Sequence, residues 1–258
     1  MAINMDVIKE LRTATGAGLA DCKNALIETN GNITEAIKIL QKKGLADSSA
    51  RSNKPTSEGR VFIKDTGNAI TIFSVKCETD FVANNELFKN LMDSDNLEKD
   101  IDNIKIATRE NIQMGEKFTI SYNSDNVIGT YIHSDNKSGA VVVLSNIENT
   151  EKAKEFAHDC CLHLVAFTPM YKSKEDVPES YIAEKKEIFS ALIDQDPKIN
   201  GKPDNVKMGI LNGKLNKHLS EICFLEQAFI KDDKVSVKNK LKEFGPNATI
   251  SEMKLVII

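Results

Sequence analysis

The segment Thr79-Asp80-Phe81-Val82 places a carboxylate beside a large aromatic side chain, between a predicted strand and a predicted helix. A loop carried on rigid elements can present such a pair to another molecule, with the carboxylate as an acceptor and the ring as an apolar wedge. A structural interpretation competes with this one, because Phe81 could fold back at the start of the helix while Asp80 caps it. The segment alone leaves both interpretations open.

Histidines and cysteines offer few arrangements for catalysis. His158 and His163 are spaced so that they point about 140 degrees apart on a helix, which disfavours a shared metal ion. Cys160 and His163 could face each other on a helix, as an activated thiol and its base would. The alternative is a buried thiol beside an imidazole at the edge of the core. A nucleophile also needs a cleft and an orienting partner, and the sequence identifies neither.

Nucleotide-binding motifs are missing from the sequence. Gly16-Ala17-Gly18 has two glycines of the dinucleotide-binding fingerprint, but the third glycine is absent and a predicted helix precedes it where a strand is required. There is also no G-x-x-x-x-G-K-[ST] loop. We therefore expect the chain to bind no cofactor and no metal ion, and the absence of catalytic motifs favours a binding protein over an enzyme.

Charge and composition restrict the partners and the compartment. The chain of 258 residues has 34 Lys and Arg against 38 Asp and Glu, so its net charge of -4 lacks the positive field of a protein that binds a phosphate backbone. Its five cysteines show no C-x-x-C spacing, which suits buried thiols in a reducing compartment. No apolar run is long enough to cross a bilayer. We expect a cytoplasmic protein that contacts neither nucleic acid nor membrane directly.

The amino-terminal part reads as three short helices. Apolar residues recur at helical spacing within residues 1–44, Asn30-Gly31 ends the second helix, and Gly44 is expected to end the third. Residues 45–59 are polar and without periodicity, which predicts a linker. The sequence therefore predicts a three-helix module, followed by a domain boundary.

Beyond the linker the hydrophobic period changes from helical to alternating. Residues 60–77 predict a β-hairpin and residues 84–92 a helix. About 70 residues later a hairpin at 129–144 and a helix at about 150–167 repeat this order. We therefore expect an α+β core of two related halves.

The weak internal repeat bears on the acid–aromatic pair. At the corner where the first half has Asp80 and Phe81, the second half has Thr150 and Glu151. The fold alone therefore does not require an acid and an aromatic residue there, so a functional role for the pair gains equal weight with the structural interpretation.

A helical hairpin is expected at about 178–223, with a bend near Pro197 and Pro203. It either projects as an arm or packs against the main sheet. Residues 234–244 suggest a short helix and 253–258 a final strand. The two core halves are thus placed at residues 60–128 and 129–258.

Segments spread over nearly the whole chain carry a family resemblance. The longest are KELR at 9–12, TGAGLADCKNAL at 15–26 and CETDFVA at 77–83. Shorter supporting segments are GTYIH at 129–133, LHLVA at 162–166, SEICFLEQ at 220–227 and FIKDD at 229–233. Together they resemble the signature segments of bacterial translation elongation factor Ts.

This resemblance implies a fold and a function. The function is guanine nucleotide exchange on elongation factor Tu during translation elongation, with binding to the GDP-bound and the nucleotide-free forms of that partner. The fold has an amino-terminal module like ubiquitin-associated domains, a core of two related α/β halves and a protruding coiled-coil hairpin. The family binds its partner and is not an enzyme.

The resemblance also implies roles for individual residues. Thr79, Asp80, Phe81 and Val82 match the segment that disturbs the magnesium site of elongation factor Tu, with Asp80 and Phe81 as the intruding pair. Further contacts with the partner's nucleotide-binding domain are implied for Arg12, Leu19, Ala20, Ile112, Met114 and, near the phosphate-binding loop, His163. The family often has methionines where Leu19 and Ala20 stand, so that contact is expected to be smaller here.

Two other classes of function remain open. A three-helix module with a glycine-rich first turn can bind small folded proteins or peptides, so a ubiquitin-like adaptor is an alternative. An enzyme that uses His163 or Cys160 is a more distant one.

Overall fold

The computed structural model describes residues 4–258, apart from the side chains of Leu45 and Ser48. The chain forms two compact units. The first comprises the residues up to Ser121, together with Ile132–Gly139 and Val256–Ile258, and the second comprises Tyr122–Tyr131 and Ala140–Leu255. Within the described residues, no helix has the length and apolar character needed to span a membrane.

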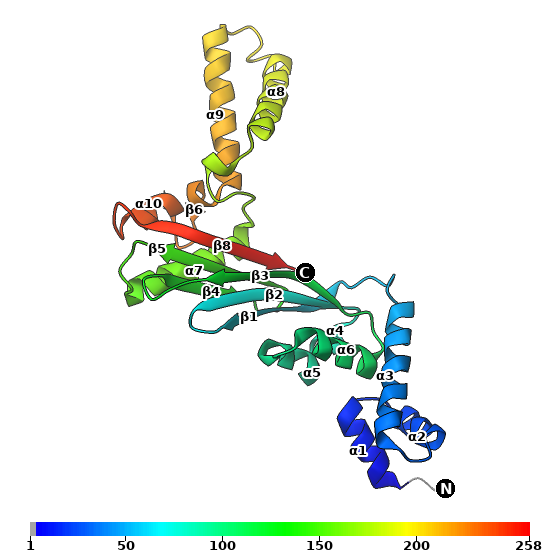
Figure 1. Ribbon diagram of the computed structural model, residues 1–258. Helices are drawn as coiled ribbons and strands as arrows, with labels where there is room; N and C mark the ends of the chain where they lie inside the picture. Colours follow the sequence, from blue (N-terminus) through cyan, green and yellow to red (C-terminus); the bar gives the residue numbers. More distant parts are fainter. Residues whose placement is uncertain (1–3) are drawn as a thin grey trace. The chain divides into compact units, whose positions relative to one another are not determined.

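The first unit begins with the three predicted helices, which are α1 (Met5–Thr15), α2 (Leu19–Glu28) and α3 (Ile33–Ala50) (Figure 1). The Asn4 side chain caps α1 by accepting a hydrogen bond from the Asp6 amide. Gly16 ends this helix in the left-handed conformation, with a φ of 66 degrees. The helices share a small core of Ile8, Leu11, Ala17, Cys22, Ala25, Leu26, Ala36 and Leu40.

The prediction that Gly44 ends the third helix is wrong, because α3 continues to Ala50. Gly44 serves packing instead of termination. A Cβ atom at this position would lie 2.5 Å from the Cα atom of Ile106 in α6 (Leu97–Thr108), so only glycine lets the two helices approach this closely. The first part of the predicted linker is therefore helical.

A three-stranded antiparallel sheet follows in the order β1-β2-β3, with strands Glu58–Asp65, Ala69–Cys77 and Gln113–Ser121. The predicted hairpin is thus confirmed, and Gly67 supplies its turn with a φ of 86 degrees. Short helices pack on one face of the sheet. Their shared core consists of Phe62, Phe73, Val75, Cys77, Val82, Ala83, Phe88, Leu91, Ile101, Ile104 and Ile112.

The helix predicted at 84–92 is divided into shorter pieces. The structure has α4 (Asp80–Ala83), α5 (Glu86–Lys89) and a 3-10 turn, η1 (Asn90–Asp93). Asn85 interrupts the helix because its side chain accepts a hydrogen bond from the Leu87 amide at 2.9 Å and so starts a new helix. A series of short helical pieces therefore follows β2 in place of one helix.

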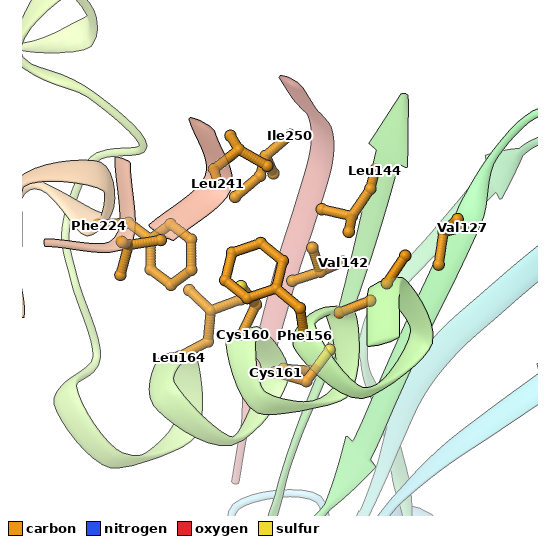
Figure 2. Close-up of a cluster of buried hydrophobic side chains, with 14 of the residues drawn as sticks. Val127, Val142, Leu144, Phe156, Cys160, Cys161, Leu164, Phe224, Leu241 and Ile250 are labelled. Carbon is orange, nitrogen blue, oxygen red and sulfur yellow. The ribbon is translucent and has the colours of Figure 1, made fainter. Parts of the chain in front are cut away.

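The second unit is built mainly on a sheet in the order β4-β5-β8, with strands Val127–Ile132, Ser138–Ser145 and Thr249–Ile257. Helix α7 (Glu151–Phe167) packs against it, and Figure 2 shows Phe156, Cys160 and Cys161 of this helix in a buried cluster with Val142 and Leu144 of β5. The predicted hairpin and helix are thus both present here, whereas in the first unit short helical pieces follow the hairpin, and the final strand is confirmed.

The predicted helical hairpin is also confirmed. Its helices are α8 (Glu179–Gln195) and α9 (Asp204–Ile222), and Tyr181 and His218 are hydrogen-bonded between them at 3.0 Å. The short elements around the hairpin are η2 (Lys174–Asp176), η3 (Phe224–Glu226), β6 (Ala228–Phe229), β7 (Asp232–Ser236) and α10 (Val237–Lys242). The helix suggested at 234–244 is thus shorter than expected, because Ser236 caps it at the end of β7.

Candidate partner-binding site

The acid–aromatic pair lies on the surface of the first unit. Phe81 is 83% exposed and Asp80 is also exposed, whereas the next side chain, Val82, is buried in the core. The cap of α4 is Thr79, whose hydroxyl oxygen accepts a hydrogen bond from the Val82 amide at 3.4 Å. Phe81 therefore does not fold back onto its helix, and Asp80 is not the cap, so the structural interpretation of this pair is wrong.

Glu110 fixes the backbone that leads into this pair. Its carboxylate accepts hydrogen bonds from the amides of Glu78 and Thr79, each at 3.1 Å, and from the Thr79 hydroxyl at 2.6 Å. Hydrogen bonds to an ionised acceptor are among the stronger ones in proteins. A single side chain thus anchors the two residues that precede Asp80.

The side chain of Glu78 forms a second set of hydrogen bonds, with Arg51 and Asn111. Its carboxylate accepts hydrogen bonds from the Asn111 amide at 2.7 Å and from two nitrogens of Arg51, Nε at 2.7 Å and Nη2 at 2.5 Å. The Arg51 guanidinium lowers the pKa of Glu78 from 4.5 to about 2. The hydrogen bonds of Glu78 and Glu110 together fix residues 78 and 79, so Asp80 and Phe81 are presented from a rigid support.

This lowered pKa predicts how the first unit responds to acid. A carboxyl group whose pKa is lower in the folded state stabilises the fold fully above its unfolded pKa, here 4.5, and this contribution is lost as the pH falls toward about 2. We expect wild type to lose more unfolding free energy than Glu78→Gln between about pH 5 and about pH 3, measured by urea unfolding. Equal losses for the two proteins would show that Glu78 is not held as described.

The other predicted contact residues of the first unit differ in exposure. Arg12 lies in the last turn of α1 and Ala20 in the first turn of α2, and both are exposed, as is Leu19 at 45%. Met114 on β3 is 38% exposed, but its neighbour Ile112 is only 2% exposed and belongs to the core. Met114 therefore has apolar surface that another molecule could reach, and Ile112 has almost none.

His163 of α7 is completely buried, with 0% exposure. Its Nε2 lies 2.9 Å from the side-chain oxygen Oε1 of Gln227, whose side-chain nitrogen Nε2 donates to the backbone carbonyl of Glu221. Nδ1 has no hydrogen-bond partner among the described residues. Burial also lowers the pKa of His163, which favours the neutral form of the ring. A direct contact between His163 and a partner would require Phe167, whose ring centroid is 4.6 Å away, or another neighbour to move.

The arrangement for nucleophilic catalysis is not supported. Cys160 is buried in the core of the second unit (Figure 2), and burial raises the pKa of its thiol well above the ordinary value. A thiol in this environment is protonated and out of reach of a substrate. In the part of the chain that the structure describes, no group of three or more His, Cys, Asp and Glu side chains could hold a metal ion.

The supporting residues Glu110, Glu78 and Arg51 were not identified from the sequence. The Arg51–Glu78 pair spans 27 residues, and the Glu110–Thr79 contact spans 31. No local spacing rule reports contacts over such separations. The one local signal is the position of Glu78 next to the acid–aromatic pair.

Comparison with known proteins identifies the class of the chain. A family model described as elongation factor TS matches residues 92–256. The chain is 44% identical to elongation factor Ts of Treponema denticola, over 100% of this chain and 98% of that protein. It is 37% identical to elongation factor Ts of Borrelia duttonii, over 94% and 93% of the two chains, and 36% identical to that of Treponema pallidum, over 93% and 92%.

These similarities place the chain among the translation elongation factors. More specifically, it belongs to the elongation factor Ts family. The resemblance seen in the sequence is confirmed.

Proposed function

We propose that this protein is a guanine nucleotide exchange factor that binds elongation factor Tu and accelerates the release of GDP during translation elongation. The exposed Asp80–Phe81 pair on its rigid support carries this proposal, and membership of the elongation factor Ts family supports the choice of partner. The protein acts by binding to its partner in the cytoplasm and catalyses no bond change of its own.

The energy required of an exchange factor is moderate. A GTPase that binds its nucleotide with nanomolar affinity gains about 12 kcal/mol, much of it through magnesium and loop amides around the phosphates. An exchange factor must bind the nucleotide-free partner better than the loaded one, and it then weakens nucleotide binding by the same factor. A thousandfold effect requires about 4 kcal/mol of coupling.

Phe81 and Asp80 are suited to supply part of this coupling. Because Phe81 is exposed in the free protein, its burial between helices of the partner would contribute about 2 kcal/mol to the complex. Asp80 would bring a negative charge close to the phosphates beside the magnesium ion, and its repulsion of the phosphates disfavours the nucleotide-bound state. The pair thus favours the state in which the magnesium and phosphate site is disturbed.

Further contacts enlarge the proposed interface. Arg12, Leu19 and Ala20 offer an exposed surface to the nucleotide-binding domain, and Met114 offers a smaller apolar one. His163 has no exposed surface, and we propose that it acts on the partner only after its neighbours rearrange.

A capture experiment from bacterial lysate tests the exchange function against an adaptor function. We expect the immobilised protein to retain elongation factor Tu and to release it when GDP and magnesium are added, because the two ligands oppose each other. If GDP and magnesium did not change the retention of elongation factor Tu, or if other proteins were captured and elongation factor Tu was not, an adaptor function would be favoured. Substrate turnover that is lost on changing His163 or Cys160 would favour an enzyme.

A further inference from the structure

Three consecutive residues at the end of α6 connect different parts of the first unit. Arg109 forms ion pairs with Asp21 of α2 and with Asp47 of α3, the latter at 3.5 Å. Glu110 binds the backbone that precedes Asp80, as described above. Asn111 donates its side-chain amide to two backbone carbonyls of the segment after α3. We refer to residues 109–111 as the junction.

The backbone at Arg109 would suit glycine. Its φ of 60 degrees and ψ of 21 degrees lie in the left-handed region, and it forms the cap at the end of α6. Glycine is the residue that most often occupies such caps because it has no Cβ atom to strain. The chain instead has an arginine there, and its side chain reaches two carboxylates on other helices. The function of this position therefore lies in the side chain.

Close packing supports a fixed arrangement at this place. The helix α6 lies against α3 at Gly44, and a Cβ atom at Gly16 would come within 2.8 Å of the Ala107 Cβ atom. The three-helix module thus contacts α6 directly, and Arg109 adds charged contacts at the end of the same helix. On its other side the junction contacts Glu78 and Thr79.

We propose that Arg109 is a positioning residue, which fixes the three-helix module relative to the Asp80–Phe81 pair so that both contact one partner molecule at the same time. The proposal rests on the exchange function proposed above. Two contact surfaces joined rigidly bind as one, because the second contact forms at a high effective concentration once the first has formed. Arg109 itself needs no contact with the nucleotide.

The variant Arg109→Gly in the full chain separates positioning from stability. The concentration of the protein that gives half-maximal GDP release from elongation factor Tu should rise about tenfold, because the two surfaces no longer bind as one. The maximal rate should stay within about twofold, since Glu110 still supports the Asp80–Phe81 pair. The thermal unfolding midpoint should be unchanged or higher, because glycine suits the left-handed backbone.

Three further variants test whether the effect of Arg109→Gly arises from its lost ion pairs. Arg109→Lys keeps a positive charge and should recover part of the lost affinity, and Asp47→Asn should weaken it in the same direction to a smaller extent. Lys105→Ala removes the Lys105–Asp102 pair on the same helix, at 3.0 Å, and should behave as wild type.

The outcomes distinguish the two proposals. If wild type accelerates GDP release but Arg109→Gly has an unchanged half-saturating concentration, positioning by Arg109 is overturned and the exchange function stands. If wild type does not accelerate GDP release at all, both proposals are overturned. A parallel fall of affinity and thermal midpoint in Arg109→Gly would also contradict positioning, because it would indicate a purely structural role.

Discussion

Replacing Phe81 by alanine should lower the rate of GDP release from elongation factor Tu about 30-fold, because it removes about 2 kcal/mol of burial in the complex. The stability of the free protein should hardly change, since the ring is 83% exposed and makes few contacts within the protein. Substitutions at such surface positions change the unfolding free energy by about 0.5 kcal/mol or less, so we expect the thermal midpoint to shift by no more than about 2 °C.

Stopped-flow fluorescence of mant-GDP bound to elongation factor Tu measures this rate. Met92→Ala is a suitable control because it removes another exposed apolar side chain from the first unit, and we expect it to retain the wild-type rate. Full activity of Phe81→Ala would contradict the proposed role of the ring. Global unfolding of this variant would contradict its exposure.

Replacing Glu110 by alanine should reduce both stability and exchange. The change removes the acceptor for the amides of Glu78 and Thr79 and for the Thr79 hydroxyl, all of them partly buried. Unpaired groups of this kind cost about 1 to 3 kcal/mol each, and water will reach some of them, so we expect a loss of about 2 kcal/mol of unfolding free energy. Exchange should fall about tenfold as the support of Asp80 and Phe81 loosens.

Urea unfolding and the mant-GDP assay together test this expectation. Glu110→Gln keeps one carbonyl acceptor and should lie between wild type and Glu110→Ala in both measurements. Glu116→Ala, which removes an exposed carboxylate from β3, provides the control. If Glu110→Ala were as stable and as active as Glu116→Ala, the hydrogen bonds of Glu110 would not support the pair.

Local patterns in the sequence predicted much of the fold. The three amino-terminal helices, the first hairpin, and helices α8 and α9 all follow from hydrophobic spacing and from turn residues such as Gly67. The second hairpin and the helix α7 were predicted for the same reason. Each of these features depends on residues that are close together in the chain.

Features set by tertiary packing were missed or placed wrongly. Gly44 reads as a helix end, but it lies inside α3 because α6 packs against it. The strand β3 and the helix α6 were not identified as elements. The burial of His163 and Ile112 could not be deduced either, because residue type does not report which side chains cover a given position.

The candidate site was predicted in its exposed part only. The sequence located Asp80 and Phe81 and the family resemblance gave them a role, yet the glutamates that hold them were missed. Glu78 and Glu110 form these contacts with residues that lie 27 to 33 positions away in the chain. Such contacts depend on how β2 and β3 pair and on where α6 ends.

The dependence of GDP release on magnesium tests whether this protein disturbs the metal site of its partner. The rate of mant-GDP release from elongation factor Tu should be measured with and without the protein, in excess magnesium and after chelation of the ion. We expect a large acceleration in excess magnesium and a much smaller one after chelation, where the step that the Asp80–Phe81 pair promotes has already occurred. An equal acceleration in both conditions would contradict a mechanism that acts through the magnesium site.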